Sequence, residues 1–153
     1  MSATPNPQNP REWPETMDFV RPESEEAAKQ DMLARFGVNA TTTAARGLSM
    51  LLTVLEPGGC SNCHMHVDSE SALYVLQGSA QFFYGEHLEH DQVVNTGDFI
   101  YVPPFCLHKV YNLSRKQRVT FVIARTDALE QERVVARPEP DDGSAQSRIE
   151  YID

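Results

Sequence analysis

The sequence of 153 residues is poor in cysteine and in basic residues, and it contains no long hydrophobic run. Its three cysteines are an odd number, which argues against a disulfide framework. Only 13 Lys and Arg residues stand against 22 Asp and Glu residues, and the formal net charge is −9. This balance argues against a nucleic-acid partner and against an anionic membrane surface. No apolar stretch approaches the roughly 20 residues that span a bilayer, so no membrane partner is expected.

The first 14 residues are polar, with prolines at positions 5, 7, 10 and 14, and they lack the apolar segment of a secretory signal peptide. We therefore expect a cytoplasmic location. Hydrophobic residues make up 41% of the chain and charged residues 23%, which is ordinary for a soluble globular protein. The length favours a single domain with a real core.

From Gly47 onward, short runs rich in Val, Leu, Ile, Phe and Tyr alternate with turn signals built on Gly, Pro, Asn and Ser. The runs cover residues 48–55, 73–76, 80–84, 99–102, 108–113 and 119–124. Many short strands with regular punctuation predict an all-β sandwich or barrel.

His64, His66 and, far downstream, His108 are the most informative residues of the chain. Side chains alternate between the two faces of a β-strand, so His64 and His66 are expected to project into one pocket, with Met65 turned away. Imidazole is a ligand suited to iron, nickel, copper and zinc. His64 and His66 are therefore predicted to be two of the ligands of a metal ion.

Two ordered motifs surround these histidines, and they resemble the two signature motifs of the cupin superfamily. The residues that carry the first are Gly58, His64, His66, Glu70 and Gly78, and those that carry the second are Gly97, Pro103, His108 and Asn112. Phe105 departs from the second motif, standing where the family usually has a glycine. The resemblance implies a double-stranded β-helix, or jelly-roll cupin barrel. It also implies a divalent metal, with Fe²⁺ favoured over Mn²⁺, Ni²⁺ or Zn²⁺, and the ligands His64, His66, Glu70 and His108.

Glu70 and Ser71 compete for the position of the carboxylate ligand. Glu70 lies at the family's distance from His66, but seven residues rather than six separate it from Gly78. Counting back from Gly78 places Ser71 in that position. A shift of one residue turns a side chain to the opposite face, and a bulge between residues 67 and 71 would restore Glu70 to the pocket. Because serine is a poor metal ligand, we expect Glu70 to be the fourth ligand.

Cys60 and Cys63 form a Cys-x-x-Cys pair beside His64, which raises the alternative of a zinc or redox site. No second pair with zinc-site spacing accompanies them, so we expect small, partly buried residues. Cys63 should face away from a pocket that holds His64. Cys106 shares a face with His108 if that strand is regular, either lining the pocket or filling the core.

The expected organisation is an N-terminal arm and helix over residues 1–45, a barrel over 46–136 and a polar tail over 137–153. Residues 22–36 predict a helix, with Pro22 near its start, glutamates in its first turn and Gly37 as its stop. The tail is expected to be mobile, although Ile149, Tyr151 and Ile152 can add an edge strand. Apolar residues on the arm, Trp13 and Phe19, together with the helix predict a homodimer.

The resemblance and the histidines together predict a metal-dependent enzyme acting on a small, oxygen-bearing organic substrate, with dioxygenase-like chemistry favoured. The sequence identifies no catalytic residue beyond the metal ligands and no organic cofactor. A non-redox decarboxylase, isomerase or lyase is the alternative within the enzymes, because cupins carry many chemistries. A non-catalytic cupin that binds a small ligand or metal, and a sugar cupin without metal, are the rivals from other classes.

Overall fold

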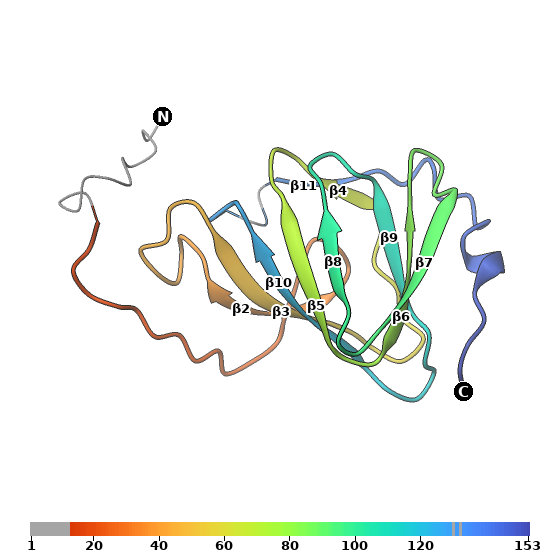
Figure 1. The fold of residues 1–153 in the computed structure, drawn as a ribbon, viewed down its shortest axis with the longest axis horizontal. Coiled ribbons are helices and arrows are strands. Elements are labelled where there is room, and N and C mark those ends of the chain that lie inside the picture. Colours follow the sequence, from red (N-terminus) through yellow and green to blue (C-terminus); the bar gives the residue numbers. More distant parts are fainter. Residues whose placement is uncertain (1–12, 130, 132) are drawn as a thin grey trace.

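Two antiparallel β-sheets packed face to face form the fold, as the sequence predicted (Figure 1). A computed structural model describes residues 13–129, 131 and 133–153. In order of adjacency, the first sheet contains β1 (Glu26–Ala27), β2 (Leu33–Val38), β3 (Ser49–Leu55), β10 (Val119–Arg125), β5 (Ser71–Gln77) and β8 (Phe99–Val102). The second contains β11 (Val134–Ala136), β4 (His64–His66), β9 (His108–Asn112), β6 (Ser79–Tyr84) and β7 (His90–Asn95).

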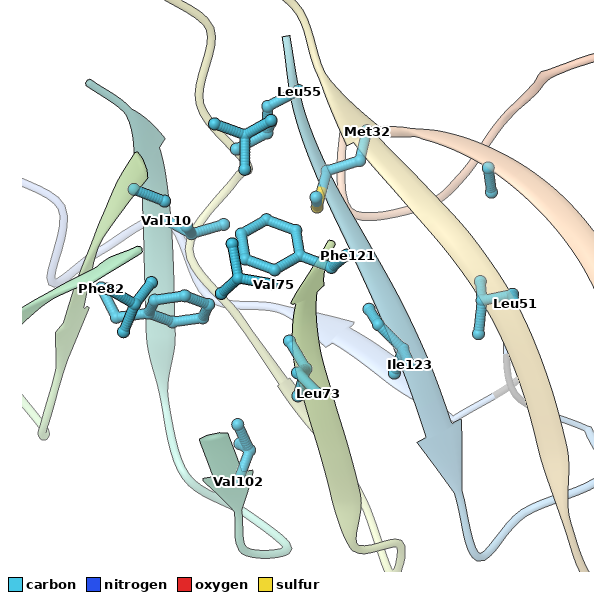
Figure 2. Close-up of a cluster of buried hydrophobic side chains, with 14 of the residues drawn as sticks. Met32, Leu51, Leu55, Leu73, Val75, Phe82, Val102, Val110, Phe121 and Ile123 are labelled. Atoms are coloured by element: carbon cyan, nitrogen blue, oxygen red, sulfur yellow. The ribbon is translucent and has the colours of Figure 1, made fainter. Parts of the chain in front are cut away.

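Strict alternation of side chains builds the core between the sheets. On β10, Val119, Phe121 and Ile123 are buried, whereas the residues between them face outward. Figure 2 shows Phe121 and Val75 of the first sheet meeting Phe82 and Val110 of the second. Burying each such side chain stabilises the fold by about 1.5–3 kcal/mol. The core therefore fixes which residues of β4, β5, β9 and β10 face the interior.

The predicted helix over residues 22–36 is wrong. Ala28 to Met32 instead form the turn of a hairpin between β1 and β2, and β2 pairs antiparallel with β3. Intrinsic helix propensity contributes little free energy per residue. The hydrogen bonds between β2 and β3 and the burial of Ala34 in the core outweigh it here. Because β2 belongs to the first sheet, the expected boundary at residue 45 does not separate an arm from the barrel.

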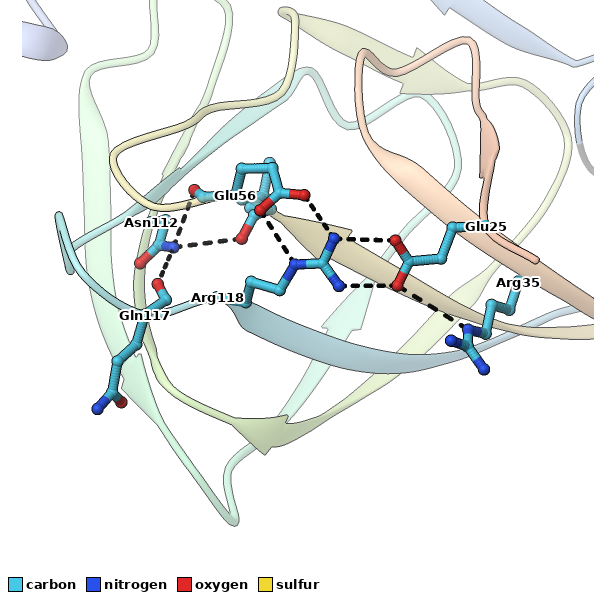
Figure 3. A network of polar contacts seen from close by, with 7 residues as sticks. Glu25, Arg35, Glu56, Asn112, Gln117 and Arg118 are labelled. Carbon is cyan, nitrogen blue, oxygen red and sulfur yellow. Dashed lines mark hydrogen bonds and ion pairs between the residues drawn. The ribbon is translucent and has the colours of Figure 1, made fainter. Parts of the chain in front are cut away.

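Glu25, expected in the first turn of that helix, takes part in a surface ion-pair network (Figure 3). The guanidinium of Arg118 contacts the carboxylates of both Glu25 and Glu56, with N–O distances of 2.9 Å and 2.5 Å. The network joins the segment before β1 to the loop after β3. Exposed ion pairs of this kind contribute little to the free energy of folding, so we assign this network no large stabilising role.

The C-terminal residues 137–153 lie against the outer side of the second sheet and do not form the expected edge strand (Figure 1). Ala145 is buried with Phe83 and Tyr111, and Nζ of Lys109 lies 2.5 Å from Oδ2 of Asp141. A short 3₁₀ helix, Gln146–Arg148, follows, and Oγ of Ser114 donates to Asp153. The tail covers apolar side chains of the sheet, which is why it is held in place rather than extended into solvent. Within the described residues, no helix has the length and apolar character needed to cross a bilayer.

Candidate metal centre

Three buried histidines meet inside the barrel. His64 and His66 project from β4 toward the interior, and His108 is the register partner of His64 on β9. Each ring offers a nitrogen, and these nitrogens lie within 4.8 Å of one another. The ring centroids of His64 and His108 are 4.3 Å apart. The strand alternation predicted for His64 and His66 is confirmed, and the fold adds His108 from the neighbouring strand.

Hydrogen bonds to backbone carbonyls orient two of the rings. Nδ1 of His64 lies 2.9 Å from the carbonyl oxygen of Asn62, and Nδ1 of His108 lies 2.9 Å from that of Cys106. A carbonyl oxygen only accepts, so each Nδ1 carries the proton and each Nε2 keeps its lone pair. Histidines that bind metals in proteins usually have such a partner on the other ring nitrogen. The hydrogen bonding therefore fits a metal ion.

Burial keeps all three rings neutral. It lowers the pKa of His64 and His66 well below the ordinary 6.5, and the Arg125 guanidinium lowers that of His66 further. The pKa of His108 falls to about 4, again chiefly through burial. A neutral imidazole offers a lone pair and an imidazolium does not. At neutral pH the cluster is a set of three nitrogen donors suited to a divalent ion.

The histidines line a cavity of about 30 Å³, the space of roughly one water molecule. Its other polar members are Gln30, Thr53, Ser71 and Arg125, and the rest of its wall is apolar. The hydroxyl of Thr53 is buried and has no hydrogen-bond partner among the described residues. It is thus a donor that a ligand in the cavity can satisfy.

Sequence reasoning missed Gln30, Thr53 and Arg125. Arg125 had a signal: the inward positions 119, 121 and 123 continue with period two to 125. In the structure, Nη2 of Arg125 lies 3.4 Å from Nε2 of His66. No comparable signal marks Gln30, because its place in the cavity depends on the hairpin that the sequence did not predict.

Ser71, not Glu70, faces the cavity. The inward side chains of β5 are Ser71, Leu73 and Val75, and Nε of Arg125 donates to Oγ of Ser71 over 3.1 Å. Glu70 is exposed and lies apart from the three histidines, contrary to the expectation of a carboxylate ligand. The reason is the period of β5, which begins at residue 71 with no bulge that turns residue 70 inward.

The cysteines lie outside this centre. Cys63 is buried among Phe83, Tyr111 and their neighbours on the far side of β4, as its position next to His64 predicted. Burial raises the pKa of its thiol to about 11. Cys60 is half-buried, Cys106 packs against the main core, and all three are free. Among the residues that the structure describes, no group of three or more metal-ligating side chains includes a cysteine.

Phe105 adopts a left-handed backbone conformation, with φ of 61°. Glycine reaches this region without strain, which accounts for the glycine that the resembling motif usually has here. The backbone N–H of Phe105 donates to the carbonyl oxygen of His66 over 2.9 Å. The loop before β9 is thereby tied to the strand that carries two of the histidines.

The family model described as "Cupin" matches residues 36–143 of this chain. The match contains the three histidines and both motifs. No curated protein matches the sequence at a significant level.

Several solved structures share the fold. An oxalate decarboxylase from Lactobacillus farciminis, in complex with formate, is 18% identical with a TM-score of 0.61, covering 76% of this chain and 33% of that one. A "Cupin 2 conserved barrel domain protein" from Salinispora arenicola is 19% identical with a TM-score of 0.60, covering 77% and 95%. A double-stranded β-helix protein from Klebsiella pneumoniae is 16% identical with a TM-score of 0.58, covering 78% and 86%. The chain spans about a third of the decarboxylase, and likeness at these identities concerns the fold alone.

Proposed function

The chain belongs to the cupin family, and we propose that it is a metal-dependent enzyme acting on a small, oxygen-bearing anion. The observation that carries the proposal is the trio His64, His66 and His108, buried, neutral and converging within 4.8 Å. A divalent ion there supplies Lewis acidity and open positions for a substrate.

The charge of the site favours an anionic substrate. Three neutral imidazoles leave the full charge of a divalent ion, and the guanidinium of Arg125 lies beside His66. The hydroxyl of Thr53 and the amide of Gln30 add hydrogen-bonding groups on the cavity wall. Apolar side chains such as Leu73 and Phe82 exclude water, which strengthens these polar interactions. The volume of about 30 Å³ restricts the substrate to a few heavy atoms or requires the barrel mouth to open.

Oxidative, dioxygenase-like chemistry is our first choice of reaction. The described ligand set consists of imidazole nitrogens, because Ser71 stands where a carboxylate was expected. Imidazole suits iron, copper, nickel and zinc, whereas carboxylate oxygen suits manganese. Iron held by His64, His66 and His108 would supply oxidative chemistry with dioxygen.

Decarboxylation is the second candidate, and the structural neighbours favour it. They include oxalate decarboxylases from Lactobacillus farciminis and Bacillus subtilis, and Mn(II) centres are described for the latter. The same charge argument favours a small dicarboxylate, which the barrel mouth would have to open to admit, given the cavity volume of about 30 Å³. These neighbours are 18–19% identical to the chain, so their activity is a hypothesis for it.

Metal analysis followed by turnover assays distinguishes the candidates. Protein purified without a metal-binding tag or chelator is analysed for metal and then incubated with small mono- and dicarboxylates, oxalate included. Bound iron with substrate-dependent oxygen uptake supports the first reaction, and release of carbon dioxide without oxygen uptake supports the second. Stoichiometric zinc without turnover indicates a non-catalytic binding protein, and protein that takes up no metal contradicts the proposal.

Alanine variants test the site itself. Replacing His64, His66 or His108 should weaken metal binding by more than the roughly 10–100-fold that loss of an outer hydrogen-bond partner costs. His90→Ala is the control, because His90 is exposed on β7. Titration calorimetry gives the affinities, and circular dichroism checks that the barrel stays folded. A His108→Ala protein with wild-type metal affinity would show that the three histidines do not form one site.

A further inference from the structure

Two buried hydroxyl groups on β3 have no hydrogen-bond partner among the described residues, and only one of them faces the cavity of the histidines. Ser49 and Thr53 both point inward from β3, and each side chain is 1% exposed. Thr53 lines the cavity, whereas Ser49 is not one of its lining residues. A buried hydroxyl without a partner raises the free energy of the folded protein. Thr53, unlike Ser49, therefore has a space beside it from which a ligand can supply the missing hydrogen bond.

Gln30 adds an amide group to the wall of the same cavity, and its side chain is 2% exposed. It lies in the turn between β1 and β2, which backbone hydrogen bonds connect to the histidines. The N–H of Asn62 donates to the carbonyl oxygen of Gln30 over 2.9 Å, and the carbonyl oxygen of Asn62 accepts from Nδ1 of His64. Oε1 of Gln30 accepts from Nε2 of Gln131 over 3.4 Å. With its oxygen bonded in this way, the amide of Gln30 offers its NH₂ group as a donor.

Arg125 lies at the other end of the cavity from Thr53. Phe121 is the register partner of Thr53, and Arg125 follows four residues later on β10, a distance of about 13 Å along the strand. Nε of Arg125 donates to Oγ of Ser71, its register partner on β5, and Nη2 lies 3.4 Å from Nε2 of His66. These contacts keep the guanidinium near His66. The cavity is therefore asymmetric, with a cation at one end and neutral hydrogen-bonding groups at the other.

The wall around Thr53 is otherwise apolar, and core side chains such as Met32, Phe82 and Phe121 contribute to it (Figure 2). At neutral pH, Arg125 is the one charged side chain among the described residues that line the cavity. A carboxylate next to Thr53 would thus be buried without a cation, which is costly. An uncharged hydroxyl or carbonyl oxygen needs only the neutral donors present there.

We propose that Thr53 and Gln30 form a subsite for an uncharged oxygen of the substrate, and that the substrate is a small monocarboxylate with a hydroxyl or carbonyl group on the neighbouring carbon. This inference rests on the proposed function, in which the metal ion and Arg125 attract the carboxylate. The second oxygen of such a molecule then meets the neutral end of the cavity. The same asymmetry weighs against a dicarboxylate, because its second charge would find no cation near Thr53.

The test compares glycolate with acetate, two carboxylates that differ in one hydroxyl group. Titration calorimetry measures their affinities for zinc-loaded protein freed of unbound zinc, since zinc is redox-inactive and binding is then observed without oxidation. Thr53→Val removes the hydroxyl and keeps the branched shape, and Thr53→Ser keeps a hydroxyl. Ser49→Ala is the matched control, because it removes the other partnerless hydroxyl of β3, away from the cavity.

The wild type and Ser49→Ala should bind glycolate about 5–10-fold more tightly than acetate, as one hydrogen bond between uncharged groups allows. Thr53→Val should abolish this preference without changing the affinity for acetate, and Thr53→Ser should retain most of it. Gln30→Met should reduce the preference, because one of the two donors is lost. A preference in Thr53→Val equal to that of the wild type would overturn the proposal, since the hydroxyl would then bind no more than a water molecule.

A second measurement uses the metal-free protein. Thr53→Val should unfold at a urea concentration equal to or above that of the wild type, because it removes a hydroxyl that the fold leaves without a partner. A clear fall in this midpoint would assign the hydroxyl to a structural bond and overturn the proposal. Zinc analysis separates the two hypotheses. Protein that binds no zinc contradicts the proposed function, whereas zinc-loaded wild type that binds glycolate and acetate equally contradicts the subsite alone.

Discussion

The hydroxyl of Tyr101 donates a hydrogen bond to Oε1 of Glu70 over 2.8 Å, on the outside of the barrel. This contact raises the pKa of Tyr101, because the neighbouring carboxylate disfavours a phenolate. The carboxylate of Glu70, which was expected among the metal ligands, therefore lies on the outer surface of the barrel. Ser71, one residue later, takes the inward position and accepts a hydrogen bond from Arg125.

Glu70→Ala should therefore keep its metal, and Ser71→Ala should keep it too. Ser71→Ala should lower the free energy of unfolding by about 1–3 kcal/mol, because a buried hydrogen bond to a charged group is lost. Metal content after dialysis and urea denaturation measure the two effects, with His66→Ala as the control that loses metal. Release of metal from Glu70→Ala alone would mean that residues 67–71 rearrange when the ion binds.

Acid should destabilise the metal-free protein in a defined window. The pKa of His108 is lowered from 6.5 to about 4 by burial, and those of His64 and His66 are also lowered. Below pH 6.5 the unfolded chain binds protons that the folded protein does not. The contribution of these histidines to the free energy of unfolding is therefore fully present above pH 6.5 and falls as the pH is lowered toward 4. His108 alone accounts for about 3 kcal/mol across this window.

Denaturation of chelator-treated protein between neutral pH and pH 4 measures this decline. His108→Asn should make the pH dependence shallower by the contribution of one titrating group, because His64 and His66 still titrate in the unfolded chain. The exposed residue His90 provides the control, and His90→Asn should leave the curve unchanged. An identical slope in His108→Asn would show that the ring is not held neutral by burial.

Asn112 should matter for stability and not for metal. Its buried Nδ2 donates to the carbonyl oxygens of Leu55, Glu56 and Gln117, which joins three chain segments (Figure 3). Asn112→Ala leaves these acceptors unpaired and should cost about 3 kcal/mol or more. Asn95→Ala, at an exposed position of β7, is the control and should cost under about 1 kcal/mol. A large fall in metal affinity of the still-folded variant would contradict this assignment.

Position 105 should favour glycine over other small residues in the stability of the protein. A left-handed conformation costs a non-glycine residue about 1–2 kcal/mol, and the side chain of Phe105 is exposed. Phe105→Gly should therefore be more stable than Phe105→Ala by about 1 kcal/mol, as thermal unfolding can measure. Both variants remove the same ring, so the difference between their stabilities reports the cost of the left-handed backbone conformation. Equal stability would show that φ at this position is not strained.

Much of the site was predictable because it depends on local periodicity. The alternation of a strand places His64 and His66 on one side and turns Cys63 away, whatever the rest of the fold does. The turn signals and short apolar runs predict the all-β architecture for the same reason. These features need only residues close together in the chain.

The remaining features depend on contacts between distant segments. Residues 22–36 have helical propensity, yet the edge of β3 converts residues 33–38 into a strand. The choice between Glu70 and Ser71 follows from the register of β5 with β8 and β10, which two nearly equal spacings in the sequence left open.

The sequence by itself determined β3, β4, β5, β6, β8, β9 and β10 and the placement of His64 and His66 on one face of a strand. Only the tertiary structure decided that His108 lies opposite His64 and that Arg125 lies beside His66. The physical reason is that side-chain direction repeats every two residues along a strand, whereas the partner across a sheet is set by the free energy of the whole core.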